Sequence, residues 1–194
     1  MGYLLARLSI TAILNVASIS LCISALALPR WVYHRNLDST TTQGLSRICT
    51  DGVCLSQVIS EYFSYTLIMV CFAVLVQIIT LVSVLMGIRV HYLNAADGFC
   101  QWDIVARFGL CSSLTSLCIA SFLFSLGLQD SYDNYGGNFA FQGILVRNIR
   151  SDSSLGAGPG PSHYFLSASI GLNVMCLFPL VGMNLFWCCA VSWC

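Results

Sequence analysis

Charged side chains are scarce in this sequence. Only 8% of its 194 residues are charged, and because all the basic residues are arginines, the chain has no lysine. A soluble domain carries about 25% charged residues, so a water-exposed globular surface is not expected here. The formal net charge is zero and no run of like charges occurs. We therefore exclude nucleic-acid binding.

Motifs of the common catalytic and cofactor sites are missing as well. The sequence has no Gly-x-Ser-x-Gly, no phosphate-binding glycine-rich loop and no His-Glu-x-x-His. The three histidines, His34, His91 and His163, fall in different segments near the ends of hydrophobic runs. Each is more typical of an interfacial or solvated side chain than of a general base. We expect no enzyme activity, cofactor or metal, and no small-molecule substrate can be identified.

The sequence does contain long hydrophobic runs. Hydrophobic residues make up 57% of it, and four runs reach the roughly 20 residues that a membrane-spanning helix needs. The runs cover about 8–29, 66–88, 108–128 and 164–187. The first is longer than the apolar part of a signal peptide, so we predict a retained helix. The sequence predicts an all-α, multi-pass membrane protein with four transmembrane helices in one domain, residues 1–194.

None of the four runs contains Asp, Glu, Lys or Arg. Charge within the membrane marks ion and proton paths, so a pump, a proton-coupled carrier or a voltage sensor is disfavoured. The polar side chains of the runs are hydroxyls, thiols and a few amides such as Asn15 and Gln77. On the third run Ser112, Ser116 and Ala120 recur at every fourth residue, a spacing that lets helices approach closely in lipid. We favour packing within the bundle over a dimer face for this row.

Four crossings divide the rest of the chain between two sides of the membrane. Both termini and the short loop, about 89–107, lie on one side, and the long loops, about 30–65 and 129–163, lie on the other. The arginines oppose the positive-inside rule if the termini are cytoplasmic, because more of them lie on the long-loop side. Another feature must therefore set the direction.

The segment from Cys49 to Cys54 supplies that feature. Asp51-Gly52 is a dipeptide typical of hairpin turns, and a turn there would bring the two cysteines together for a disulfide worth about 2 kcal/mol. Metal binding needs about four ligands, with only His34 nearby, and a redox pair would have Cys-x-x-Cys spacing. We favour the disulfide, which requires an oxidising compartment for loop 30–65. Both termini are then predicted to be cytoplasmic.

Three further cysteines stand at the end of the last run. Cys188, Cys189 and Cys194 follow it directly, and juxtamembrane cysteines are candidates for S-palmitoylation. Unmodified thiols are an equal alternative.

Several motifs resemble the claudin, peripheral myelin protein and calcium-channel γ-subunit superfamily. Pro29-Arg30-Trp31 resembles the Pro-x-Trp that opens the first extracellular loop of claudins. Gly44-Leu45-Ser46-Arg47-Ile48-Cys49, followed by Cys54, resembles the Gly-Leu-Trp-x-x-Cys…Cys signature, with Ser46 in place of the tryptophan. Gly160-Pro-Ser162-His-Tyr164 is similar to the entry to the fourth span. The signature residues are Trp31, Gly44, Leu45, Cys49 and Cys54.

This resemblance implies a claudin-like fold in the plasma membrane. Its parts would be a left-handed four-helix bundle and a small extracellular β-sheet from loop 30–65, extended by a strand from loop 129–163. It also implies a non-enzymatic role. With an outer loop braced by Cys49 and Cys54, no catalytic group and no charged path, our first hypothesis is an accessory or organising subunit that contacts lipid and a partner integral membrane protein of channel or receptor type. One alternative is a self-associating cell-junction adhesion protein. A remote alternative is a membrane thiol oxidoreductase that uses Cys49 and Cys54.

Overall fold

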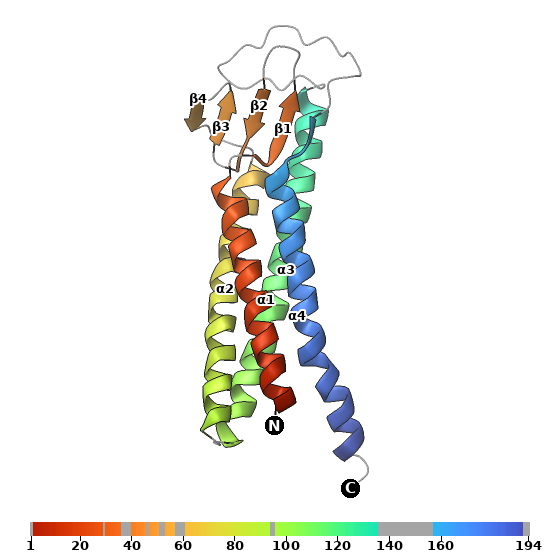
Figure 1. Ribbon diagram of the computed structural model, residues 1–194. Coiled ribbons are helices and arrows are strands. Elements are labelled where there is room, and N and C mark those ends of the chain that lie inside the picture. Colours follow the sequence, from red (N-terminus) through yellow and green to blue (C-terminus); the bar gives the residue numbers. More distant parts are fainter. Residues whose placement is uncertain are drawn as a thin grey trace.

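Four long helices and a small sheet make up the computed structural model. The backbone is described for residues 2–28, 30–35, 40–45, 47–50, 53–56, 61–93, 96–135 and 157–191. Side chains are described for a smaller set, residues 5–28, 30–32, 42, 44–45, 61–93, 102, 104–127 and 159–178. The helices are α1 (Gly2–Ala27), α2 (Glu61–Tyr92), α3 (Ala96–Tyr135) and α4 (Pro161–Val191). They run side by side with the sheet at one end, and α1 begins and α4 ends at the other (Figure 1).

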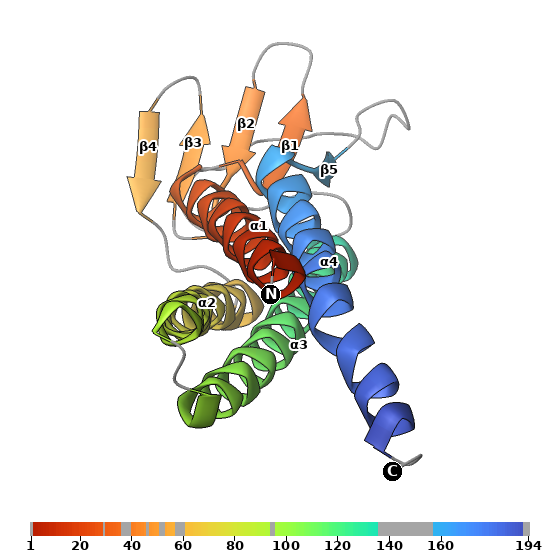
Figure 2. The ribbon, with the colours of Figure 1, turned by 60° about the horizontal axis from the view of Figure 1, so that its bottom comes forward.

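The helices form a closed ring in chain order. Each of the described helices packs against its neighbours in sequence, and α4 closes the ring against α1. Among the described residues, Cα atoms of the diagonal helix pairs do not come within 8 Å of one another. Figure 2 shows α4 turning away from the bundle toward its C-terminal end. The most extensive pairing is between α2 and α3, which are only three residues apart in sequence.

Buried residues recur along every helix at alternating intervals of three and four. This is the period of helices that wrap around one another with a left-handed twist. On α1 and α4 the buried positions that follow this period are Leu8, Thr11, Asn15, Ser18, Cys22 and Ala25, then Ser162, Leu166, Ser169, Asn173 and Cys176. On α2 the row is Phe63, Thr66, Val70, Ala73, Gln77, Thr80, Val84 and Gly87, and Ser83 beside it is buried as well.

The placement of polar and apolar side chains is the reverse of that in a soluble helix bundle. Many of the buried positions carry hydroxyl or amide groups, whereas the outward face of α2 presents Ile68, Phe72, Leu75, Ile79 and Val82 to the surroundings. Three helices contain stretches long and apolar enough to cross a membrane, namely Leu5–Ala27, Glu61–Tyr92 and Ile104–Gly127 among the described residues. These are features of an all-α membrane protein.

The helices extend past the hydrophobic runs from which they are predicted. Most of segment 89–107, expected to be a loop, is helical, since α2 continues to Tyr92 and α3 starts at Ala96. Likewise α3 continues to Tyr135, into the expected loop 129–163. The reason is that leaving the hydrocarbon ends the need for apolar side chains but does not break backbone hydrogen bonds. No proline occurs in either helical extension.

Five short strands form one antiparallel sheet in the order β4-β3-β2-β1-β5. Their bounds are β1 (Val32–Arg35), β2 (Thr40–Gln43), β3 (Arg47–Thr50), β4 (Val53–Ser56) and β5 (Ala157–Pro159). The first four follow one another as a meander between α1 and α2. The fifth comes from the chain just before α4 and pairs with β1. The sheet therefore joins two segments that are far apart in sequence.

Candidate functional site

The sheet is attached to the bundle at two helix ends. β1 starts shortly after α1 ends, and β5 ends just before α4 begins. The Gly160 backbone nitrogen donates to the Trp31 carbonyl oxygen at 2.6 Å, and the Ser162 nitrogen donates to the Arg30 oxygen at 3.3 Å. The Ser162 hydroxyl also donates to the Leu28 carbonyl oxygen at 3.1 Å, satisfying an acceptor at the end of α1. These bonds attach the start of the sheet to the end of α1 and the beginning of α4.

An aromatic cluster fills the junction below the sheet. The Trp31 ring is 1% exposed, and its Nε1 donates to the Ala25 carbonyl oxygen at 2.8 Å. The ring centroids of Trp31 and Phe124 are 5.2 Å apart, and those of Phe63 and Phe124 are 5.7 Å apart. Tilted pairs at such distances are favourable beyond the area they bury. Phe124 therefore links α2 and α3 to the start of the sheet.

His163 completes this cluster from α4. Its ring stacks on Phe124 with a centroid distance of 4.9 Å and an interplanar angle of 24°, and Tyr164 lies next to it. Burial lowers the pKa of His163 below the ordinary value of 6.5. Its Nδ1 is buried and has no hydrogen-bond partner. The imidazole here acts as an apolar ring that joins α4 to the junction.

Three of the signature residues converge at the junction. Trp31 and Leu45 belong to one apolar cluster together with Val32, and Leu45 is 5% exposed. Gly44 beside it is buried. Gly44 and Leu45, which follow β2, thus lie against the bundle and attach the middle of the sheet to the helix ends.

The other two signature residues face each other across β3 and β4. Cys49 is the register partner of Cys54, and Thr50 is the partner of Val53. Only residues 51–52 lie between that last pair, which is the spacing of a two-residue hairpin. Directly opposed residues in an antiparallel pair have Cα atoms about 4.5–5.5 Å apart. A disulfide accepts about 4.4–6.8 Å, so the backbone register permits one.

The small-residue row of α3 lies largely inside the bundle. Ser116 and Ala120 are buried, and Ser112 is partly buried. The Thr66 hydroxyl of α2 is 3.5 Å from the Ala120 carbonyl oxygen. The row therefore faces the tight α2–α3 contact.

The remaining cysteines are spread over the molecule. Cys188 and Cys189 lie in the last turns of α4, at the end of the bundle opposite the sheet. Their side chains are outside the described set, and Cys194 lies outside the described residues altogether. Cys22 and Cys176 are buried free thiols, and Cys71, Cys111 and Cys118 are exposed free thiols. Within the residues searched, no three His, Cys, Asp or Glu side chains gather as a metal site would require.

Comparison with known proteins gives no family. No family model matches the sequence, and no curated protein matches it either. The arrangement of the junction and the sheet is thus the main guide to function.

Phe124 and His163 are the junction residues that sequence reasoning did not select. Phe124 lies in a run already rich in apolar residues, and His163 was interpreted as interfacial. The signal for Phe124 was the 3–4 spacing, which places it in register with Ala120 and Leu117 on the inner face of α3. His163 lies beside the corresponding row of α4 and had no such signal.

Proposed function

We propose that this chain is a non-enzymatic, four-span plasma-membrane protein that serves as an accessory or organising subunit of another integral membrane protein. The sheet lies outside the cell, and both termini lie in the cytoplasm. The observation that carries this proposal is the double attachment of the sheet through β1 and β5, fixed by the Gly160–Trp31 hydrogen bond. A small sheet held rigidly on a helix bundle suits recognition of a protein partner.

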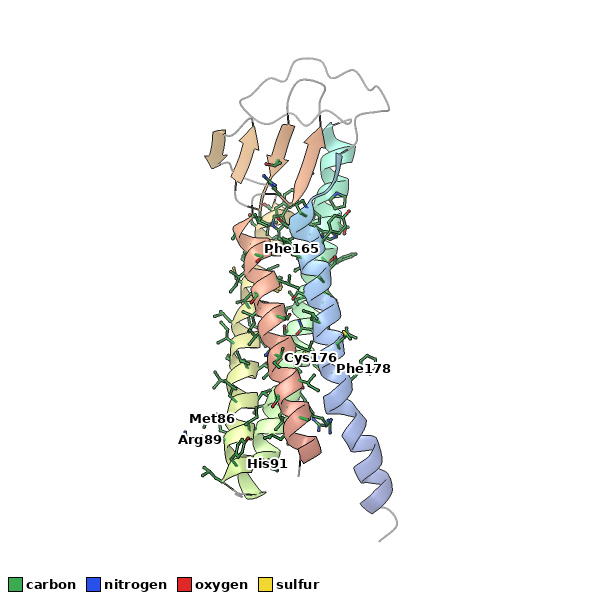
Figure 3. All side chains as sticks on the ribbon, in the orientation of Figure 1. Met86, Arg89, His91, Phe165, Cys176 and Phe178 are labelled. Atoms are coloured by element: carbon green, nitrogen blue, oxygen red, sulfur yellow. The ribbon has the colours of Figure 1, made fainter. Side chains whose placement is uncertain are left out.

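The fourth crossing is supported by the length and packing of α4. Its 31 residues extend about 46 Å, which exceeds the roughly 30 Å of a bilayer's hydrocarbon core. Ser169 and Asn173 face α1 through hydrogen bonds to Ser18, at the same depth as an apolar candidate span. Phe178 points away from the bundle (Figure 3), as a lipid-facing residue would.

The direction of the crossings follows from a Cys49–Cys54 disulfide. The opposed backbone positions of the two residues support such a bond, and disulfides persist in the oxidising space outside the cell. The bond would keep the β3–β4 hairpin, at the free edge of the sheet, in one register.

The claudin-like assignment is part of this proposal. It is supported by the burial of Trp31, Gly44 and Leu45 at one junction and by the pairing of Cys49 with Cys54 in register. The partner would bind through the spans and the outer sheet.

Direction across the membrane can be tested with glycosylation. Arg150→Thr creates an Asn-Ile-Thr acceptor at Asn148, far from either neighbouring hydrophobic run. The matched control carries the same acceptor sequence on a linker after Cys194. Glycosylation of the Arg150→Thr protein alone is the expected result. Glycosylation of the C-terminal acceptor would reverse the proposed orientation.

Partner binding can be tested by quantitative cross-linking in intact cells followed by purification in a gentle detergent. The Cys49→Ser/Cys54→Ser protein is compared with a Cys71→Ser/Cys118→Ser control at equal surface amounts. We expect a defined heterologous membrane protein with the wild type and the control, and at least a tenfold smaller yield with the sheet variant. Recovery of the chain alone would refute the accessory role. Recovery of a second, differently tagged copy as the sole partner would favour the junctional alternative.

A further inference from the structure

Six polar side chains form a layer across the bundle, here named the polar layer. All are fully buried, with 0% exposure, and they come from all four helices: Asn15, Ser18, Gln77, Ser113, Ser169 and Asn173. Buried polar groups are costly in hydrocarbon unless each has a hydrogen-bond partner. A layer of six therefore raises the question of where each donor and acceptor is satisfied.

Apolar clusters close the polar layer along the bundle axis. Toward the sheet lies a cluster that includes Cys22, Ala73, Leu117 and Leu166. Toward the opposite end lie Leu110 and Cys176, followed by Leu8, Val84 and Ala106. On every helix the layer falls between members of these clusters. Among the described residues the layer thus has apolar side chains on both sides along the bundle axis, an arrangement that suits a site and not a channel.

Ser18 is the centre of the hydrogen bonds in this layer. Its Oγ accepts from Gln77 Nε2 at 3.0 Å and from Asn173 Nδ2 at 2.7 Å. Both acceptor positions of the hydroxyl are then filled, so its single proton goes to Ser169, whose Oγ lies 2.6 Å away. The hydroxyl of Ser18 is fully satisfied and binds α1, α2 and α4 together.

The side-chain amide oxygens of the polar layer have no hydrogen-bond partner. Asn15 Oδ1, Gln77 Oε1 and Asn173 Oδ1 are each buried without a partner, as is Ser113 Oγ. The nitrogen and oxygen of an amide are about 2.2 Å apart, which places the Gln77 and Asn173 oxygens within roughly 5 Å of Ser18 Oγ. Turning an amide over would leave an unpartnered NH₂ instead. The layer therefore lacks hydrogen-bond partners whichever way each amide is oriented.

Three other buried hydroxyls of the bundle do not show this deficit. Those of Thr80, Ser83 and Ser116 each donate to the carbonyl oxygen four residues earlier, at 2.8–2.9 Å. Ser113, on the same helix as Ser116, makes no such bond. Four unpartnered atoms thus lie in the layer, while Thr11 Oγ1, one turn from Asn15 on α1, and His163 Nδ1 at the junction are unpartnered outside it. Because most buried polar groups in proteins are paired, a group of four such atoms calls for a partner.

We propose that ordered water molecules occupy the polar layer and hydrogen-bond to the carboxamide oxygens of Asn15, Gln77 and Asn173 and to Ser113 Oγ. Water both donates and accepts, so it satisfies a hydroxyl as well as three carbonyl-type oxygens, and a buried water makes about three such bonds. The layer holds no carboxylate that would offset the charge of a cation. This site is independent of the proposed accessory function.

The first test uses two serines one turn apart on α3. Ser113→Ala removes the unpartnered hydroxyl, and Ser116→Ala removes a hydroxyl already bonded to Ser112. In a hydrated layer Ser113→Ala loses a water bond, so its melting temperature in lipid nanodiscs is equal to or below that of Ser116→Ala. In a dry layer it removes an unsatisfied group, and its melting temperature rises above the control. That rise would overturn the proposal.

The second test detects the water directly by X-ray radiolytic labelling in H₂¹⁸O. Hydroxyl radicals form at bound water and oxidise adjacent side chains. Cys22 and Cys176 flank the layer, and Cys71 and Cys118 are exposed free thiols on the outside of the bundle. We expect ¹⁸O incorporation in nanodiscs to be several-fold faster at the flanking pair. Equal or slower labelling there would refute bound water. A melting temperature specifically raised by Na⁺ or K⁺ over choline would assign the site to a cation and also overturn the proposal.

Discussion

The backbone nitrogen of Gly160 lies 2.6 Å from the carbonyl oxygen of Trp31, which fastens the start of α4 to the beginning of the sheet. A Cβ at position 160 would collide with the Arg30 carbonyl oxygen and lie 2.8 Å from its carbonyl carbon. Backbone atoms cannot rotate aside as a flexible side chain can. We expect Gly160→Ala to reduce the free energy of unfolding by about 1–3 kcal/mol, measured by thermal melting in detergent.

Gly171→Ala is the matched control for that change. A Cβ at position 171 meets nothing within 4 Å, and alanine is the better helix former by about 1 kcal/mol. The melting temperature should therefore stay the same or rise. A loss equal to that of Gly160→Ala would show that the steric account of the junction is wrong.

The α2–α3 contact makes a second prediction through Gly109 and Thr80. A Cβ at position 109 would collide with Thr80 Oγ1 but lie a tolerable 3.3 Å from Thr80 Cβ. Gly109→Ala should therefore cost about 1–3 kcal/mol, and Thr80→Ala should restore much of that stability in the double variant. A double-mutant cycle on unfolding free energies measures the coupling. Additive effects would contradict a direct clash.

Substitutions at Trp31 separate its hydrogen bond from its packing. Trp31→Phe keeps an aromatic ring near Phe124 but loses the Nε1 bond to the Ala25 oxygen, for a cost of about 1 kcal/mol. Trp31→Ala also removes the ring and should cost about 3–5 kcal/mol. Melting curves of the two variants test the order. Equal losses would mean that the ring contacts contribute little.

His163 gives the protein a pH dependence of known sign. Since burial lowers its pKa below 6.5, the unfolded chain takes up a proton as the pH falls through about 6.5, before the folded protein does. Stability is complete above that pH and decreases below it. His163→Phe keeps a ring beside Phe124 and should flatten the melting temperature between about pH 7.5 and pH 5. An unchanged slope in this variant would assign the dependence to another group.

Helix number and approximate position follow from the sequence because each hydrophobic run has only one way to satisfy its backbone in lipid. The four helices expected from the runs are present. Their true lengths were not predictable, because hydropathy reports where lipid contact ends and α2 and α3 remain helical beyond it. The exposed apolar face of α2 and its buried Gln77 also follow from the residues once the period of three and four is recognised.

The junction and the polar layer were decided only by tertiary structure. Nothing local tells that Phe124 stacks on His163, or that amides and hydroxyls from all four helices lie at the same depth, because such contacts join positions up to 155 residues apart. The sequence by itself determined a chain that is apolar in four runs and free of charge within them. Side-chain packing between helices, which depends on register and distance in space, determined which polar groups meet and which are left to be satisfied by water.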